Sequence, residues 1–252
     1  MKNVFVFDVD GTLTPARQSI ASDFENFFRE FVSKEIVFLA SGSDYLKLQK
    51  QVPIDILKAC EGVFGCAGAQ HYKSGNLVVE KHHEFLPELQ KLCSDFVDAS
   101  DYPHRTGNHI EARTGMLNIS SVGRNANTSE RQRYHKWDQL YGERSSFVKL
   151  INESTLPYEA SAGGQISIDV VPIGWNKSVV KDQVLNLIPD ARIIFFGDRM
   201  GAGGNDKPLA DALSLAGEPH HAICVDGYKD TWREIVLMLK RLHKNDKQYV
   251  AA

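Results

Sequence analysis

Short runs of apolar residues, each closed by turn-forming residues, recur in the first and last thirds of this 252-residue chain. They are Val4–Phe7, Ile36–Ala40, Val63–Phe64, Ile193–Phe196 and Ala222–Val225. Runs with apolar side chains on both faces are typical of strands buried between two layers. Apolar residues at helical spacing fill the stretches between them, over residues 18–33, 178–188 and 230–243. This alternation predicts an α/β fold with a mostly parallel sheet covered by helices.

The middle of the chain has a different pattern, in which polar and apolar residues alternate. The alternating segments are Leu77–Glu80, His109–Arg113, Met116–Ser120 and Gln165–Val171, and helical patterns cover residues 83–98 and 128–153. Alternation favours an antiparallel sheet with one packed face and one open face. We therefore predict an α/β cap domain over residues 81–173, inserted into a core domain formed by residues 1–80 and 174–252. The chain would cross between the domains near Lys81 and near Pro172–Gly174.

Charge and cysteine content argue against several classes of function. Lys and Arg number 29 against 32 Asp and Glu, and the net charge of -3 argues against nucleic acid or a membrane surface as the partner. The four cysteines show no CxxC or metal-binding spacing, which is typical of free thiols in a reducing compartment. Asp8 and Asp10 interrupt the first apolar run too early for a secretory signal, and no run approaches the roughly 20 residues of a membrane span. We expect a cytoplasmic protein.

Two aspartates, Asp8 and Asp10, follow the first predicted strand and precede Gly11, which allows a sharp turn. The carboxyl ends of parallel strands face the ligand crevice, and residues two apart in a regular strand share a face. Carboxylates this close repel unless a cation lies between them, so we expect Mg²⁺ there. One carboxylate can then attack a metal-bound phosphate while the other transfers the proton. The alternative is a plain Asp-Gly turn, which leaves the second acid without a role.

The stretch Asp8-Val9-Asp10-Gly11-Thr12 after an apolar strand resembles the DxDGT motif of the haloacid dehalogenase (HAD) superfamily of phosphotransferases. That resemblance implies a Rossmann-like core, a Mg²⁺ cofactor, Asp8 as the nucleophile, and Asp10 as the acid/base, with its carbonyl on the metal. Further matches to the superfamily imply that Ser41 binds a phosphoryl oxygen, that Lys177 balances the nucleophile and the phosphate, that Asp198 is a direct metal ligand, and that Asn205 and Asp206 support the metal or its waters. For Ser41 the alternative is a helix start capped by Ser43 or Asp44.

Three arginines lie on or beside the predicted strands of the cap: Arg113, Arg124 and Arg131. Guanidinium groups pair with phosphate oxygens through two hydrogen bonds, although surface arginines in weak salt bridges are the alternative. Their stretch, Ile110–Ser120 continuing to Arg131, resembles the eukaryotic-type phosphomannomutases, as do Gly163–Val170 and Gly174–Lys177. The resemblance implies a cap of the C2b type. It also implies that these arginines hold the phosphate that is not reacting, and that further contacts to the substrate come from Arg17, Asn118, Ser167 and Asp169.

The resemblance implies interconversion of mannose 6-phosphate and mannose 1-phosphate through an aspartyl-phosphate at Asp8, with a hexose 1,6-bisphosphate activator. It also implies a place in GDP-mannose biosynthesis, use of glucose phosphates and a homodimer through the cap. A second cationic cluster has a partner in a mutase, which holds a bisphosphate, whereas a phosphatase acting on a sugar monophosphate leaves it without one. The competing hypotheses are a HAD sugar-phosphate phosphatase and a non-catalytic sugar-phosphate sensor.

The chain departs from the phosphomannomutase pattern at three places. It has Phe64–Ala69 where family members carry a PENG-like segment, and the Asp198 loop reads Arg-Met-Gly-Ala rather than Lys-Thr-Met-Pro. Beyond Asp206, the stretch Lys207–Asp211 replaces the acidic residues that hold a second cation in the family. These departures bear on the second metal and on the identity of the substrate.

Overall fold

The larger sheet forms the centre of the core domain. A computed structural model describes the backbone of residues 1–249 and the side chains of residues 1–241. Over this part of the chain the sheet has seven strands in the order β11-β10-β1-β2-β3-β4-β5. Five of them are parallel: β1 (Lys2–Phe7), β2 (Ile36–Ala40), β3 (Gly62–Gly65), β10 (Ala191–Gly197) and β11 (His221–Cys224). The last two strands in this order, β4 (Gln70–Lys73) and the edge strand β5 (Asn76–Glu80), are antiparallel to their neighbours.

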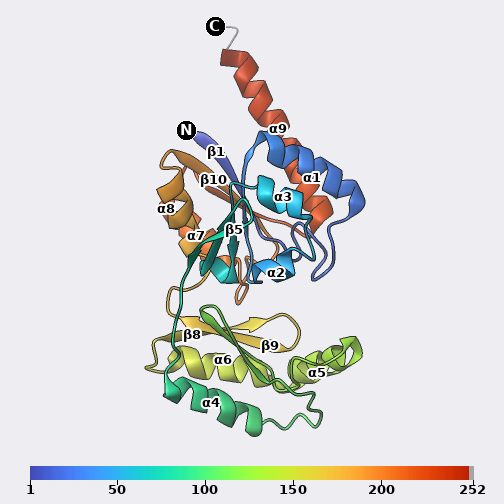
Figure 1. Cartoon of the computed structure of the whole chain (residues 1–252), viewed down its shortest axis with the longest axis vertical. Coiled ribbons are helices and arrows are strands. Elements are labelled where there is room, and N and C mark those ends of the chain that lie inside the picture. Colours follow the sequence, from blue (N-terminus) through green and yellow to red (C-terminus); the bar gives the residue numbers. More distant parts are fainter. Residues whose placement is uncertain (250–252) are drawn as a thin grey trace.

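Helices cover both faces of this sheet (Figure 1). On one face, Phe5 and Phe7 of β1 pack against α1 (Ser22–Lys34), α2 (Tyr45–Leu48), α3 (Ile54–Ala59) and α9 (Tyr228–Tyr249). On the other face, Val4 and Val6 pack against α7 (Val179–Leu187) and α8 (Lys207–Ala216). Successive side chains of a strand point to opposite faces, so the apolar run Val4–Phe7 of β1 serves both layers. The burial of this run explains why it is apolar without alternation.

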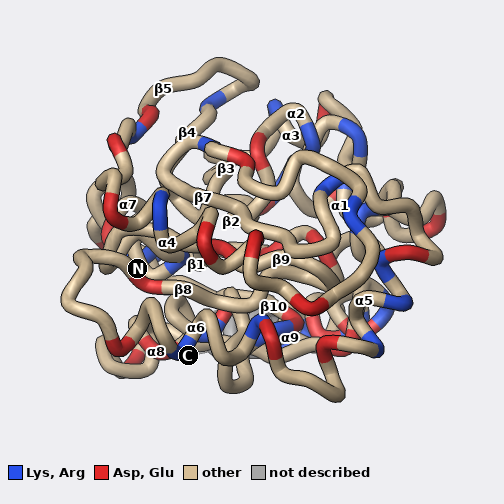
Figure 2. The backbone as a smooth tube through the Cα atoms, turned by 90° about the horizontal axis from the view of Figure 1, so that it is seen from below, with Lys and Arg blue, Asp and Glu red and all other residues tan. Residues whose placement is uncertain are grey.

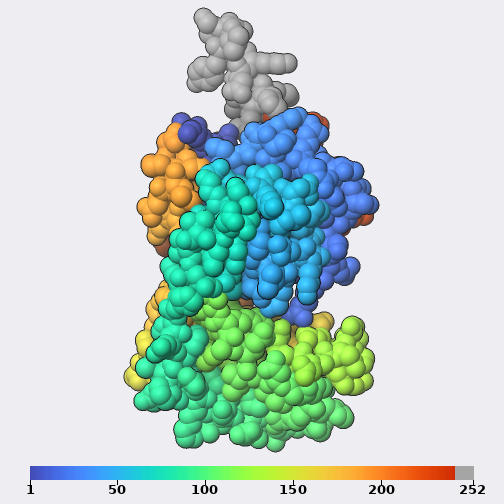
Figure 3. Space-filling model, viewed as in Figure 1, coloured from blue at the N-terminus to red at the C-terminus, as the bar shows by residue number. Residues whose placement is uncertain are grey.

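The cap domain is built on a second, antiparallel sheet in the order β6-β7-β9-β8. Its strands are β6 (Ile110–Arg113), β7 (Met116–Ile119), β8 (Tyr158–Gly163) and β9 (Ser167–Pro172). The helices α4 (Pro87–Asp98) and α6 (Glu143–Glu153) pack on one face of this sheet, and α5 (Thr128–Tyr141) lies beside it. The other face is turned toward the core (Figure 1). The space-filling view shows the two domains as separate bodies that meet across a waist (Figure 3).

The predicted fold class is confirmed, while one predicted helix was wrong and one strand was missed. Leu77–Glu80 belongs to β5 at the edge of the core sheet, where a turn at Ser74 and Gly75 folds it back, antiparallel, onto β4. The helix predicted over 128–153 is two helices, because Gly142 adopts a left-handed conformation (φ 67°) and ends α5. The strand β8 was not predicted. The chain leaves the core sheet after Glu80 and returns after Pro172.

Lys and Arg positions are interspersed with Asp and Glu positions along the backbone, as the view from the cap end shows (Figure 2). All four cysteines are free, and Cys224 is the exposed one. Among the residues that the structure describes, no helix combines the length and the apolar character needed to cross a membrane.

Candidate active site

Three carboxylates gather at the carboxyl end of the core sheet. Asp8 follows β1, Asp198 follows β10, and Asp206 lies in the next loop, with one oxygen from each within 4.8 Å of the others. The parallel register pairs Phe7 with Phe196, which brings both strand ends to the same edge. Asp8 is 2% exposed and Asp206 is 0% exposed. Asp198 is half-buried, and gathering it with two buried carboxylates is costly unless positive charge accompanies them.

Lys177 supplies one positive charge to this cluster. Its Nζ donates hydrogen bonds to Asp8 Oδ1 and, at 2.5 Å, to Asp206 Oδ1. Burial lowers the pKa of the Lys177 ammonium, but the charges of Asp8 and Asp206 outweigh burial and raise that pKa above its usual value. Burial raises the pKa of Asp8 to about 7 although Lys177 opposes the shift, and burial also raises the pKa of Asp198 to about 6. One ammonium is therefore insufficient to neutralise the cluster.

The remaining charge fits a bound divalent cation. Asp198 Oδ1 is buried and has no hydrogen-bond partner, so it is free to bind a metal. Carboxylate oxygens are the ligands that Mg²⁺ prefers. Gly11 lets the loop after β1 pass against this carboxylate: its φ is +88°, and a Cβ there would lie 2.3 Å from Asp198 Oδ2. Asp8, Asp198 and Asp206 could hold the cation.

The carboxylate of Asp10 has different partners. Its Oδ1 accepts hydrogen bonds from the backbone N–H of Arg17 at 2.7 Å and from Gln51 Nε2 at 2.8 Å. We expected Asp8 and Asp10 to share a face because residues two apart in a regular strand do so. However, β1 ends at Phe7 and the chain turns at Gly11, so Asp10 lies outside the regular strand. The predicted contact of its carbonyl with the metal stays a prediction. Sequence reasoning missed Gln51, because nothing in the sequence marks a residue 41 positions away as its partner.

The loop after β2 presents Ser41. Its Oγ accepts the N–H of Ser43 at 3.0 Å, and the side chain is 1% exposed. Asp44 caps α2, because its side chain accepts the N–H of Lys47 at 2.9 Å. Capping therefore falls to Asp44, and Ser41 remains available to a ligand.

The segment that follows β3 is strained and holds the Ser41 loop by hydrogen bonds. Cys66 and Ala67 both adopt positive φ, 49° and 55°. Their N–H groups donate to Ser43 O at 3.0 Å and to Ser41 O at 2.9 Å. This is the segment in which the chain departs from the family pattern, and left-handed conformations are costly for residues other than glycine.

A cavity of about 400 Å³ joins the carboxylate cluster to the open face of the cap sheet. The core contributes Asp8, Asp10, Arg17, Ser41, Asp198 and Asn205 to its wall, and the cap contributes Arg113, Asn118, Arg124, Ser167 and Asp169. Residues from both domains, far apart in the sequence, therefore face the same space.

Arginine side chains gather at the cap side of this cavity. Arg113 donates to Glu111 Oε2 at 2.6 Å, and Arg124 Nε lies 3.4 Å from the same oxygen. Burial, together with the neighbouring charges of Arg113 and Arg17, lowers the pKa of Arg124 to about 10. Guanidinium groups that repel one another beside a cavity favour an anionic ligand. Glu111, which holds both arginines, was not identified from the sequence.

Ser167, Asn118 and Asp169 lie on neighbouring strands of the open face. Arg124 donates to Ser167 Oγ at 2.5 Å, and Asn118 donates to Asp169 Oδ1. Asn118 Oδ1 is buried without a partner, which leaves an acceptor for a hydroxyl group. Burial raises the pKa of Asp169 although Asn118 and the arginines oppose the shift.

Arg131, the third predicted phosphate-binding arginine of the cap, does not line this cavity. It donates instead to Ala126 O at 2.7 Å and to Arg124 O at 2.8 Å. Arg131 therefore stabilises the loop that carries Arg124 through these hydrogen bonds.

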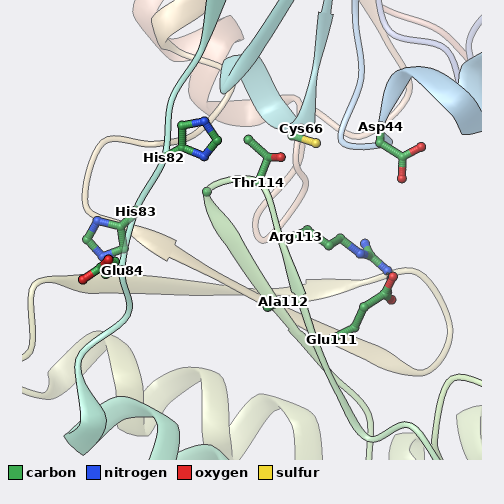
Figure 4. A pocket seen from close by; sticks show the side chains of 10 residues that line it. Asp44, Cys66, His82, His83, Glu84, Glu111, Ala112, Arg113 and Thr114 are labelled. Carbon is green, nitrogen blue, oxygen red and sulfur yellow. Dashed lines mark hydrogen bonds and ion pairs between the residues drawn. The ribbon is translucent and has the colours of Figure 1, made fainter.

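Two larger cavities adjoin the 400 Å³ cavity. One, of about 780 Å³, lies between the β6–β7 turn and the first linker, which is the segment 81–86 between β5 and α4 (Figure 4). It shares Arg113 with the 400 Å³ cavity. The other, of about 520 Å³, includes Lys177 and shares Gly42, Asp169 and Asn205. The 780 Å³ cavity thus lies beside the β6–β7 turn rather than at the carboxylates.

Comparison with known proteins shows the family of this chain. The family model described as eukaryotic phosphomannomutase matches residues 24–239. The phosphomannomutase of Galdieria sulphuraria is 36% identical over 213 residues, which cover 81% of this chain and 83% of that protein.

Solved structures share the fold at low sequence identity. The C-terminal domain of trehalose-6-phosphate phosphatase from C. albicans has a TM-score of 0.58 at 20% identity, and the match covers 90% of this chain and 80% of that one. A haloacid dehalogenase-like hydrolase from Bacteroides thetaiotaomicron has a TM-score of 0.53 at 15% identity, covering 84% and 86%. These structures establish the HAD fold. The family match extends over most of the chain, and the chain belongs to the eukaryotic phosphomannomutase family.

Proposed function

We propose that the protein is a phosphomannomutase that interconverts mannose 6-phosphate and mannose 1-phosphate. The observation that carries the proposal is the shared cavity, which has Asp8 on the core side and Arg113 and Arg124 on the cap side. A hexose bisphosphate has a phosphate at each end, and this cavity offers a reactive carboxylate to one and guanidinium groups to the other. Membership of the phosphomannomutase family supports the same reaction.

The residues divide the chemistry between them. In our proposal an Asp8 oxygen attacks the phosphorus of a hexose 1,6-bisphosphate, and the bond from phosphorus to the sugar oxygen breaks. Asp10 protonates the leaving sugar oxygen, and in the reverse direction it removes the proton from the incoming hydroxyl. Lys177 balances the charge of Asp8, while Ser41 binds a phosphoryl oxygen. Asp8, Asp198 and Asp206 would hold Mg²⁺, and Asn205 would support the waters of the metal. The cation would supply further positive charge to the reacting phosphate.

The cap residues hold the other end of the sugar. In our proposal Arg17, Arg113 and Arg124 bind the phosphate that is not reacting, and Asn118, Ser167 and Asp169 contact the sugar hydroxyls. After one transfer the sugar turns over and the two phosphates exchange places. The cap excludes water during this step, because water would hydrolyse the aspartyl-phosphate.

The test is the identity of the product. Mannose 1-phosphate is incubated with enzyme, Mg²⁺ and glucose 1,6-bisphosphate, and products are followed by ³¹P NMR. We expect hexose 6-phosphate with little free phosphate, and Asp8→Asn should abolish its formation. Free phosphate as the main product would instead indicate a HAD sugar-phosphate phosphatase. Tight binding of the sugar phosphate without turnover would indicate a sensor.

We further propose that the protein acts in the cytoplasm as a homodimer formed by the cap. Leu140, Tyr141 and Leu150 on the cap helices are 82%, 68% and 51% exposed, which supports a covered apolar surface there. Sedimentation of Leu140→Glu against the unmodified protein tests this contact.

A further inference from the structure

The β6–β7 turn of the cap contacts the core through three polar side chains, Gln70, Glu80 and Thr114, which we call the cap junction. Thr114 Oγ1 donates to Glu80 Oε1 at 2.9 Å. Gln70 Nε2 donates to the same Glu80 oxygen at 2.7 Å and to Thr114 Oγ1 at 3.2 Å. Gln70 lies on β4 and Glu80 ends β5, so a core carboxylate holds a cap hydroxyl.

The residue after Thr114 packs against the core and a linker. Gly115 has φ +67°, and a Cβ there would lie 2.8 Å from the Trp175 ring and 3.2 Å from Ala69 Cβ. Trp175 belongs to the linker that returns to the core, and Lys81 of the first linker lies 5.6 Å from its ring centroid. The turn and both linkers therefore meet at one place, and the turn is a third attachment between the domains.

This attachment is adjacent to a residue of the substrate cavity. Arg113 immediately precedes Thr114, and it lines both the 400 Å³ cavity and the 780 Å³ cavity. Figure 4 shows Thr114 at the turn and the Arg113 guanidinium directed toward Glu111. Consecutive Cα atoms are about 3.8 Å apart, so a fixed Thr114 restricts where Arg113 can lie relative to Asp8 in the core.

We propose that Glu80 is a positioning residue for sugar-phosphate binding, acting through Thr114 to place Arg113 over the substrate cavity. The inference rests on the proposed function, in which Arg113 binds the phosphate that is not reacting. Hydrogen bonds from Gln70 and Thr114 lower the pKa of Glu80, so the carboxylate remains ionised as the acceptor. A charged acceptor at a partly buried boundary, where the Glu80 side chain is 24% exposed, gives the junction its strength.

The test compares Thr114→Val, which removes the donor and keeps the shape, with Thr114→Ser, which keeps the donor. We expect Thr114→Val to raise KM for mannose 1-phosphate about tenfold, as loss of one hydrogen bond to a charged acceptor implies. Hydrolysis of p-nitrophenyl phosphate, which does not reach the cap arginines, should stay at the wild-type rate. Thr114→Ser should have the KM of the wild-type protein, because it keeps the hydroxyl donor.

Glu80→Ala should reproduce the effect of Thr114→Val, and the double variant should be no worse than either single variant. Thr155→Val and Glu88→Gln are matched controls at exposed positions of the cap and should leave both assays unchanged. An unchanged KM in Thr114→Val would overturn the inference. So would independent, additive effects of the two variants, or equal losses on sugar and aryl phosphates, which would indicate a merely structural role.

Arg113→Ala separates this inference from the proposed function. If Arg113→Ala raises KM for the hexose phosphate and Thr114→Val does not, the positioning role of the cap junction is wrong and the proposed phosphate site is supported. If Arg113→Ala leaves KM unchanged, both are wrong.

Discussion

Replacing Lys177 with methionine removes the ammonium group from the middle of the buried carboxylates. The Lys177 side chain is 1% exposed and donates hydrogen bonds to Asp8 and Asp206, whose side chains are 3% and 0% exposed. Methionine has a similar length and no charge, so the variant fills the space and leaves the carboxylates unpaired. Removing one partner of a buried ion pair costs about 3–5 kcal/mol. In a chain of this size each kcal/mol lowers the melting temperature by about 2–4 °C, so we expect a fall of roughly 6–20 °C.

The pH dependence follows from the same charges. Burial already raises the pKa of Asp8 to about 7 against the opposing charge of Lys177, so loss of the ammonium raises this pKa further. Between the pKa of the unfolded chain and the higher folded value, the folded variant binds more protons than the unfolded chain. The free energy of unfolding of Lys177→Met should therefore fall as pH rises from about 6 to about 8.

Thermal unfolding in EDTA and in Mg²⁺, at several pH values, tests this reasoning. Mg²⁺ should stabilise Lys177→Met more than the wild type, because the cation replaces part of the missing charge, while mutase turnover is lost. Lys91→Met, at a side chain that is 75% exposed, is the control and should melt like the wild type. A Lys177→Met protein that melts within about 2 °C of wild type in EDTA would refute the assigned role, because less than about 0.5–1 kcal/mol would then be involved.

Further predictions concern the cap, the loop after β1 and the metal. Arg124→Ala should raise KM for mannose 1-phosphate about tenfold or more and leave p-nitrophenyl phosphate hydrolysis unchanged, since the lost hydrogen bonds are to a charged phosphate; equal losses would contradict the phosphate role. Gly11→Ala places a methyl group against Asp198 and should weaken Mg²⁺ binding about 10- to 100-fold by calorimetry; unchanged affinity would show that Asp198 is not a ligand. Because burial raises the pKa of Asp8 to about 7, Mg²⁺ affinity should decrease as pH falls through that value, with proton release on binding measured in buffers of different ionisation enthalpy; pH-independent affinity would exclude this coupling. Ala67→Gly relieves a positive φ of 55° and should raise the free energy of unfolding by about 0.5–1 kcal/mol in urea titrations; a loss of stability would show that the conformation carries no strain.

The core fold was predictable because burial acts locally on strand composition. Val4–Phe7 contacts helices on both faces, so its sequence has no polar position, and its strand character was visible without the rest of the chain. The predicted helix over 128–153 was wrong because Gly142 ends α5 through a left-handed conformation, and glycine within a helical pattern does not by itself indicate which of its conformations it adopts. The alternation in Leu77–Glu80 indicated an antiparallel strand, but only the structure showed that its partner is β4, because alternation reveals an open face and not which strand lies beside it.

The residue types at the candidate site were likewise present in the sequence, since Asp8, Lys177 and Asp198 occur next to strand ends or helix starts. Their contacts were not. Gln51 reaches Asp10, Glu111 holds two arginines, and Arg131 binds backbone carbonyls instead of lining the cavity.

The sequence by itself determined the layers of the core, the insertion of a cap and the chemistry of the strand-end carboxylates. It did so because the burial of strands and the reactivity of side chains depend on residues within a few positions of one another. Only the tertiary structure decided which charges face one another across the domains and which hydroxyl ties the cap turn to Glu80. Such contacts join residues far apart in the chain, and their geometry depends on how two separately packed domains meet.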